Sequence, residues 1–165
     1  MKKALIIIDV QKGFINKLTK PIVIKIRKYI LKTNNHYDLL IFTQYFNRKG
    51  SNFIRSLKWS GFMDKNQTDL ADEIKELING NHLFPKFTYS SFVDNKLFSL
   101  LKKNKIDQVE LAGFDTENCV LTFARDAFDR GMSVLVLKNL TASHSSPRLH
   151  KAALEIIKHN IGIIK

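Results

Sequence analysis

Short apolar runs alternate with segments of helical period along the whole chain, and this alternation limits the possible fold more than any other feature. The run over 4–10 is rich in isoleucine and stays apolar up to Asp9, which is typical of a strand buried on both faces. Pro21 then begins a segment whose apolar residues recur every three to four positions, as in a helix that buries one face. Further strands are predicted over 37–44, 82–85, 108–112, 133–137 and 161–164. Further helices are predicted over 68–80, 95–103, 120–128 and 149–159.

Strands that alternate with helices indicate a parallel sheet covered by helices on both faces. We therefore predict an α/β fold with three layers, α/β/α. A length of 165 residues fits one domain with a real core, so we expect a single domain over 1–165. The segment 45–67 has no clean period and is predicted to be a long loop with at most one turn of helix. Loops of that length are often functional.

The composition limits which cellular compartment and which binding partners are expected for this protein. A single cysteine cannot form an internal disulfide, so we expect a cytoplasmic protein. The apolar run near the start is too short for a signal peptide, and no stretch approaches a membrane span. The net charge is +12, but the lysines are spread out and form no run of five like charges. We therefore expect a solvated basic surface, with neither nucleic acid nor a membrane as partner.

The only cysteine, Cys119, follows the predicted strand 108–112 and a polar turn. A helical pattern begins at the next residue, and Gly131 is expected to end that helix. A thiol in the first turn of a helix lies near the positive end of the helix dipole, which lowers its pKa and favours the nucleophilic thiolate. The alternative is a small core residue, because unpaired cysteine is among the most buried residue types.

Two further residues whose side chains could take part in catalysis are predicted at the same edge of the sheet. Asp9 follows the first strand and Lys86 follows the third. In open parallel sheets, ligands bind outside the carboxyl ends of the strands, so these residues and Cys119 form a plausible shared site. A carboxylate beside a thiol can take its proton, and an ammonium can stabilise the charge that develops.

Three segments, in this order, resemble motifs of the isochorismatase-like cysteine hydrolases. Residues 5–14 (LIIIDVQKGF) resemble the opening D-x-Q-x-x-F signature of that family. Residues 85–92 (PKFTYSSF) resemble its lysine segment, K-x-x-Y-S-x-F, and residues 113–120 (GFDTENCV) resemble its nucleophile turn, G-x-x-T-x-x-C-V. The resemblance covers essentially the whole chain.

The resemblance implies six strands in the order 3-2-1-4-5-6, a homo-oligomer and an Asp9-Lys86-Cys119 triad. By analogy, Asp9 takes the thiol proton, Cys119 attacks a carbonyl or nitrile-like carbon, and Lys86 stabilises developing charge. A thioester forms, and water activated by Asp9 then releases the acid. The resemblance also implies a cis peptide bond between Phe114 and Asp115, and an oxyanion hole formed by the backbone N–H groups of Asp115 and Cys119.

Departures from the family pattern refine this expectation. The isochorismatases proper lack the cysteine, so Cys119 indicates the branch that hydrolyses amides. Nicotinamidases of the family carry a metal-binding D-x-H after the T-Q of the second strand, where this chain has Tyr45 and Asn47. The five histidines show no metal-ligand spacing on one helix face, and no glycine-rich phosphate loop is present. We therefore expect no metal and no cofactor.

A small amide is the expected substrate, held by an aromatic pocket of the kind that suits a small, flat or apolar molecule. The expected pocket residues are Phe14, Tyr45, Phe46, Tyr89, Phe92 and Phe114. Each of them also fits a core position. His144, in the loop after the fifth strand, is a further candidate for substrate contact. A second function class stays open, namely a non-catalytic small-molecule-binding or redox-responsive protein on the same scaffold.

Overall fold

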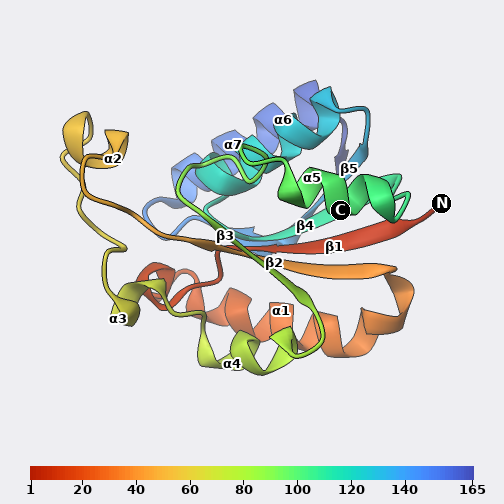
Figure 1. Ribbon diagram of the computed structural model, residues 1–165, viewed down its shortest axis with the longest axis horizontal. Coiled ribbons are helices and arrows are strands. Elements are labelled where there is room, and N and C mark those ends of the chain that lie inside the picture. The colour runs from red at the N-terminus through yellow and green to blue at the C-terminus, as the bar shows by residue number, and fades with distance from the viewer.

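The computed structural model describes residues 1–165, apart from the side chains of residues 34 and 163. A central parallel sheet lies between two layers of helices, with α1 and α4 on one face and α5, α6 and α7 on the other (Figure 1). This confirms the predicted three-layer α/β architecture. The strands are β1 (Lys3–Ile8), β2 (Leu39–Tyr45), β3 (His82–Lys86), β4 (Gln108–Phe114), β5 (Ser133–Ala142) and β6 (Ile163–Ile164). The helices are α1 (Lys20–Thr33), α2 (Asn52–Arg55), α3 (Lys65–Thr68), α4 (Asp72–Lys75), α5 (Lys96–Lys103), α6 (Leu121–Asp129) and α7 (Pro147–Asn160).

Five full strands lie in the order β3-β2-β1-β4-β5, and every neighbouring pair is parallel. The sixth strand, expected over 161–164, is reduced to the two residues of β6, which pair with β5. Ile161 caps α7, and the N–H groups of Ile161 and Gly162 both donate to the carbonyl of Ile157. The end of the helix therefore uses the residues that would have lengthened the strand.

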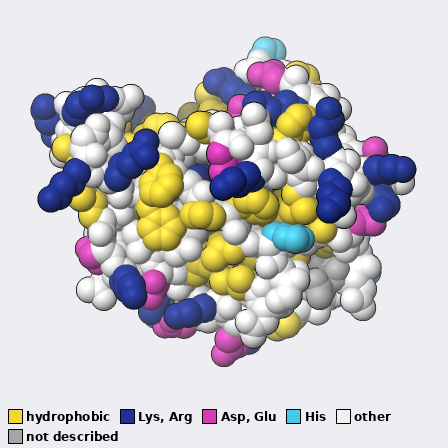
Figure 2. Space-filling view, viewed as in Figure 1, with side chains coloured by type: hydrophobic (Ala, Val, Ile, Leu, Met, Phe, Trp, Pro, Cys, Tyr) yellow, Lys and Arg dark blue, Asp and Glu magenta, His cyan; other side chains and the backbone are white. Residues whose placement is uncertain are grey.

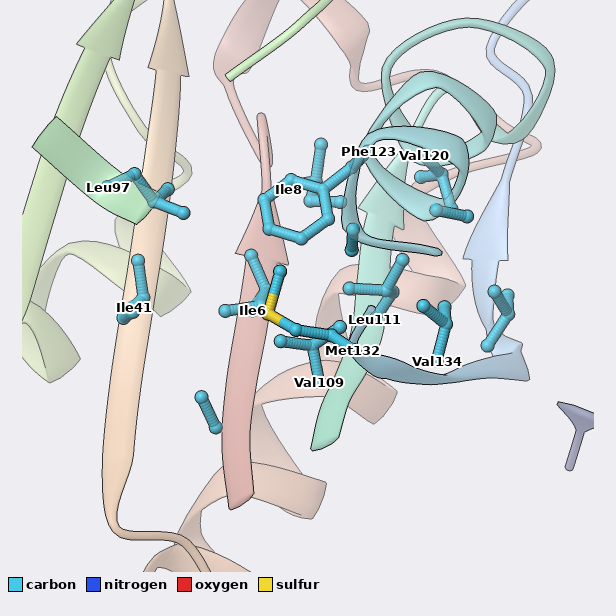
Figure 3. Packing of buried hydrophobic residues seen from close by; sticks show 14 of the residues in the cluster. Ile6, Ile8, Ile41, Leu97, Val109, Leu111, Val120, Phe123, Met132 and Val134 are labelled. Atoms are coloured by element: carbon cyan, nitrogen blue, oxygen red, sulfur yellow. The ribbon is translucent and has the colours of Figure 1, made fainter. Parts of the chain in front are cut away.

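The core consists of two apolar clusters, one on each face of the sheet, because alternate residues of a strand point to opposite faces. Ile6 and Ile8 of β1 pack with β4 residues under α5 and α6, as Figure 3 shows. Leu5 and Ile7 of the same strand pack on the other face against α1 residues such as Ile26. Five of the six β1 residues are buried, as the apolar run predicted. Each such isoleucine contributes about 1.5–3 kcal/mol to stability through burial.

The helix predicted over 68–80 forms only in its second half, because the segment is divided. Thr68 ends α3, whose N-cap is Asp64, and a new helix, α4, begins at Asp72, followed by a 3-10 turn over Glu76–Ile78. Between the helices, Leu70 forms an isolated antiparallel bridge with Gln11. This pairing with the segment after β1 holds the backbone extended where the sequence pattern favoured a helix.

The nucleophile segment begins with one π-helical turn, Thr116–Val120, and continues as α6. Gly131, with φ +80°, follows the helix as predicted. At the end of β4, Gly113 has φ +120°, and a Cβ there would lie 2.1 Å from the carbonyl oxygen of Ile8. Only glycine allows β4 to pass this close to the end of β1, directly beside Asp9.

Within the described residues, no helix has the length and apolarity needed to span a membrane.

Candidate active site

Asp9, Lys86 and Cys119 meet at the carboxyl edge of the sheet. Asp9 directly follows β1, Lys86 is the last residue of β3, and Cys119 lies in the π-helical turn after β4. The Lys86 Nζ lies 2.8 Å from Asp9 Oδ2 and donates a hydrogen bond to Cys119 Sγ at 3.1 Å. All three residues are buried, with exposed fractions of 0%, 6% and 5% respectively. The structure thus brings together the three residues that the sequence predicted.

Neighbouring polar groups fix the positions of the Asp9 and Lys86 side chains. Thr43, on the adjacent strand β2, donates from Oγ1 to Asp9 Oδ1 at 2.7 Å. Lys86 Nζ also donates to the carbonyl oxygens of Thr88 and Tyr89, at 3.0 and 3.2 Å. The chain after β3 therefore turns back around its own lysine and aims the ammonium at Asp9 and Cys119.

The electrostatics of the site differ from the prediction in one respect. Burial lowers the pKa of Lys86, but the interactions with Asp9 and Cys119 together outweigh burial and raise it, so the ammonium stays protonated. Burial raises the pKa of the Cys119 thiol; Lys86 lowers it, and the Asp9 carboxylate raises it again, so that the net shift is upward. The predicted low thiol pKa is therefore wrong, because burial outweighs the helix position.

The turn before the nucleophile is tied to the loop after β5. The peptide bond between Phe114 and Asp115 is cis, as the resemblance implied. The Asp115 carboxylate accepts from the backbone N–H of His144 at 2.8 Å, and its other oxygen lies 2.6 Å from His144 Nδ1. The hydrogen bond with Asp115 outweighs partial burial and raises the pKa of His144.

A cavity of about 190 Å³ opens beside Cys119. The sequence predicted three of its aromatic wall residues, namely Phe14, Tyr45 and Tyr89. His144 also lines it, with its ring 5.1 Å from the Phe14 ring. The remaining lining residues are Phe53, Leu57, Trp59, Asp115 and Asn118. The walls are mostly apolar, so a substrate here would lie in a largely dry pocket that ends at the thiol.

Three of the expected pocket residues are not among those that line this cavity. Phe92 is 2% exposed and packs on Phe123, with ring centroids 4.8 Å apart, in the core below the α5 and α6 layer. Phe114 is fully buried in the cluster on the opposite face of the sheet. Phe46 packs toward Phe87, at a centroid distance of 6.2 Å. Neighbouring residues of an extended chain point in opposite directions, so Tyr45 lines the cavity and Phe46 does not.

Two aromatic wall residues were missed by the sequence analysis. Phe53 and Trp59 belong to the aperiodic segment 45–67, and they pack on Tyr45 with centroid distances of 5.3 and 6.1 Å. Their aromatic character, in a segment that already adjoins the site, was the available signal. The segment forms one wall of the cavity, which agrees with the functional role expected of a loop of that length.

The residues at the family's metal-ligand positions do not fit a metal ion. The Asn47 side chain donates to the carbonyl oxygen of Gly61 at 3.0 Å and accepts from Ser51 Oγ at 2.6 Å, so both of its ends hold the 47–61 loop together. Tyr45 lies within the aromatic cluster and is 3% exposed. In the part of the chain that the structure describes, no three His, Cys, Asp or Glu side chains are grouped to hold a metal.

Comparison with known proteins agrees with this architecture. The isochorismatase domain model matches residues 3–164. The uncharacterized isochorismatase family protein YrdC of Bacillus subtilis is 30% identical over 143 residues, which cover 86% of this chain and 74% of that protein. Nicotinamidase 3 of Arabidopsis thaliana is 27% identical over 156 residues, covering 92% of this chain and 78% of that protein. The crystal structure of the pyrazinamidase/nicotinamidase from Streptococcus mutans UA159 superposes with a TM-score of 0.86 and 26% identity, covering 99% of this chain and 100% of that one. The chain belongs to the isochorismatase family, and it is a hydrolytic enzyme of that family.

Proposed function

We propose that this enzyme hydrolyses a small amide through a thioester on Cys119. The observation that carries the proposal is the double contact of Lys86 Nζ, at 2.8 Å from Asp9 Oδ2 and 3.1 Å from Cys119 Sγ, beside the cavity. Base, cation and thiol are thereby held in one buried site. The names of the two nicotinamidase relatives support an amide as the bond that is cleaved.

In the acylation step, Asp9 takes the thiol proton while the sulfur attacks the carbonyl carbon. Burial keeps the thiol protonated until attack, because it raises the pKa of Cys119. Lys86 remains an ammonium and stabilises the negative charge that develops on the sulfur during attack and then on the tetrahedral intermediate. The C–N bond breaks, and the leaving nitrogen takes from Asp9 the proton that came from the thiol.

In the deacylation step, a water molecule attacks the thioester and gives a proton to Asp9. The C–S bond breaks, the acid leaves, and Asp9 returns the proton to Cys119. We further propose that the backbone N–H groups of Asp115 and Cys119 stabilise the oxyanion in both steps. Both residues line the cavity, which supports this role.

Ammonia release from a panel of primary amides, including nicotinamide and pyrazinamide, tests the proposed function. We expect turnover by the wild type and loss of at least about a thousandfold in Cys119→Ala, because residues of one catalytic unit each carry most of its effect. For the same reason, Asp9→Asn should cost nearly as much, and the double variant should cost little more. Losses that multiply in the double variant, or turnover that Cys119→Ala retains, would refute the shared mechanism.

A further inference from the structure

A second, wider hollow adjoins the active-site cavity and plays no part in the mechanism above. It has a volume of about 490 Å³ and shares Phe53, Leu57 and Tyr89 with the cavity beside Cys119. We call it the outer groove; the segments 48–57 and 87–89 supply its lining residues. The loop that carries α2 extends beyond the carboxyl ends of the strands (Figure 1). A molecule held at Cys119 can therefore continue past Tyr89 into the outer groove.

The outer groove is basic. Arg48 and Arg55 line it, and no aspartate or glutamate is among its lining residues. Lys and Arg side chains gather on the projection that carries α2, as Figure 2 shows. Among the ion pairs of the described residues, none includes Arg48 or Arg55. Both cations are thus available to an anion that enters the groove.

Each arginine is exposed, makes one side-chain contact and still has N–H groups to offer. The Arg48 guanidinium lies 5.2 Å from the centroid of the Phe87 ring, over its face. Arg55 donates from Nη2 to Asn52 Oδ1 at 2.7 Å. A guanidinium has five N–H donors in a planar fork, so the contact of Arg55 uses only part of them. Arginines with free N–H groups are well suited to a carboxylate, which they bind through paired hydrogen bonds.

We propose that the outer groove is an anion subsite and that the substrate is an amide carrying a carboxylate. This inference rests on the proposed amide hydrolysis. The amide end lies in the apolar cavity at Cys119, and the carboxylate lies in the outer groove against Arg48 and Arg55. The segment 87–89 adjoins both ends of such a substrate. Its residues line the outer groove, and its Thr88 and Tyr89 carbonyl oxygens accept hydrogen bonds from Lys86 beside Cys119.

A series of amic acids, from malonamate to adipamate, tests the subsite when each is paired with an uncharged alkyl amide of the same length. The readout is the ratio of kcat/KM for the charged amide to that for its uncharged partner. We expect this ratio to reach about tenfold at the best length, from charge-assisted hydrogen bonds at an exposed site. Raising the salt from about 50 mM to about 500 mM should reduce the ratio, because exposed charges are screened.

Substitutions of single arginines identify the residues that raise the ratio of kcat/KM for charged over uncharged amides. Arg48→Gln and Arg55→Gln should each lower the ratio several-fold, and together they should bring it near one. Arg148→Gln is the matched control, since it removes the same charge from another exposed arginine that lies outside both hollows, and it should keep the ratio. A ratio of one in the wild type, or a high ratio that survives both groove substitutions, would overturn the subsite.

A binding measurement distinguishes a failure of the anion subsite from a failure of the proposed amide hydrolysis. Calorimetry with Cys119→Ala measures the binding of the same amic acids without turnover. If the wild type hydrolyses no amide, but Cys119→Ala binds an amic acid and loses that binding when Arg48 and Arg55 are replaced, the subsite stands and the amide hydrolysis fails. Equal binding of amic acids and uncharged amides by Cys119→Ala would overturn the subsite, whatever the turnover result.

Discussion

The buried ion pair between Lys86 and Asp9 should show strong energetic coupling. Its charged atoms lie 2.8 Å apart, with side-chain exposures of 5% and 0%. At that distance the attraction is about 6 kcal/mol at an effective dielectric constant of about 20, and it is opposed by the desolvation of both ions. Removing one partner of a buried pair leaves an uncompensated charge and typically costs about 3–5 kcal/mol. We therefore expect Lys86→Met to lower the free energy of unfolding by about that amount.

A double-mutant cycle with Lys86→Met and Asp9→Asn measures the coupling by urea unfolding. The double variant buries no unpaired charge, so it should be more stable than the sum of the single effects predicts, by about 2 kcal/mol or more. The exposed pair Lys12–Asp72 is a control at almost the same distance, 2.9 Å, and it should show little coupling because solvent screens it. Additive losses at Lys86 and Asp9 would refute the account of this pair.

The other predictions concern the thiol, metals and His144. Because burial raises the pKa of Cys119, the rate of alkylation by iodoacetamide should have its midpoint above about pH 8.5, the free-thiol value, whereas a midpoint below that value would contradict the buried thiol. Because Asn47 is engaged in the loop and Tyr45 in the aromatic cluster, purified protein should carry no stoichiometric zinc, iron or manganese, and activity should survive EDTA; loss of activity that added metal restores would show a metal site. The folded-state pKa of His144 is raised, chiefly by its hydrogen bond with Asp115, so its stabilising contribution is complete below about pH 6.5 and is lost as the pH rises through the folded value. Urea unfolding should thus show a larger deficit for His144→Gln at about pH 5.5 than at about pH 9, and equal deficits would count against this linkage.

The sequence predicted the layered sheet and the meeting of Asp9, Lys86 and Cys119 because both depend on local pattern and on a general rule. An apolar run such as 4–10 is typical of a strand buried on both faces. Residues that follow parallel strands share one edge of the sheet. The cis bond before Asp115 followed from the family resemblance rather than from the residues themselves.

The errors arose where tertiary contacts decide the outcome. The pairing of Leu70 with Gln11 interrupts the helix predicted over 68–80, and no local pattern encodes that pairing. The burial of Phe92 and Phe114 depends on the direction in which each side chain points, which a shift of one residue reverses. The raised pKa of Cys119 depends on its burial beside Asp9, which the position in a helix does not reveal.

The central claim, covalent catalysis by Cys119, is tested most directly by acid-quenched intact-mass spectrometry during turnover of the best amide in the panel. We predict a mass gain equal to the acyl group, mapped to the peptide that contains Cys119 and absent from Cys119→Ala, which also releases no ammonia above background. An adduct mapped to another residue, or ammonia release by Cys119→Ala at the wild-type rate, would contradict the thioester mechanism.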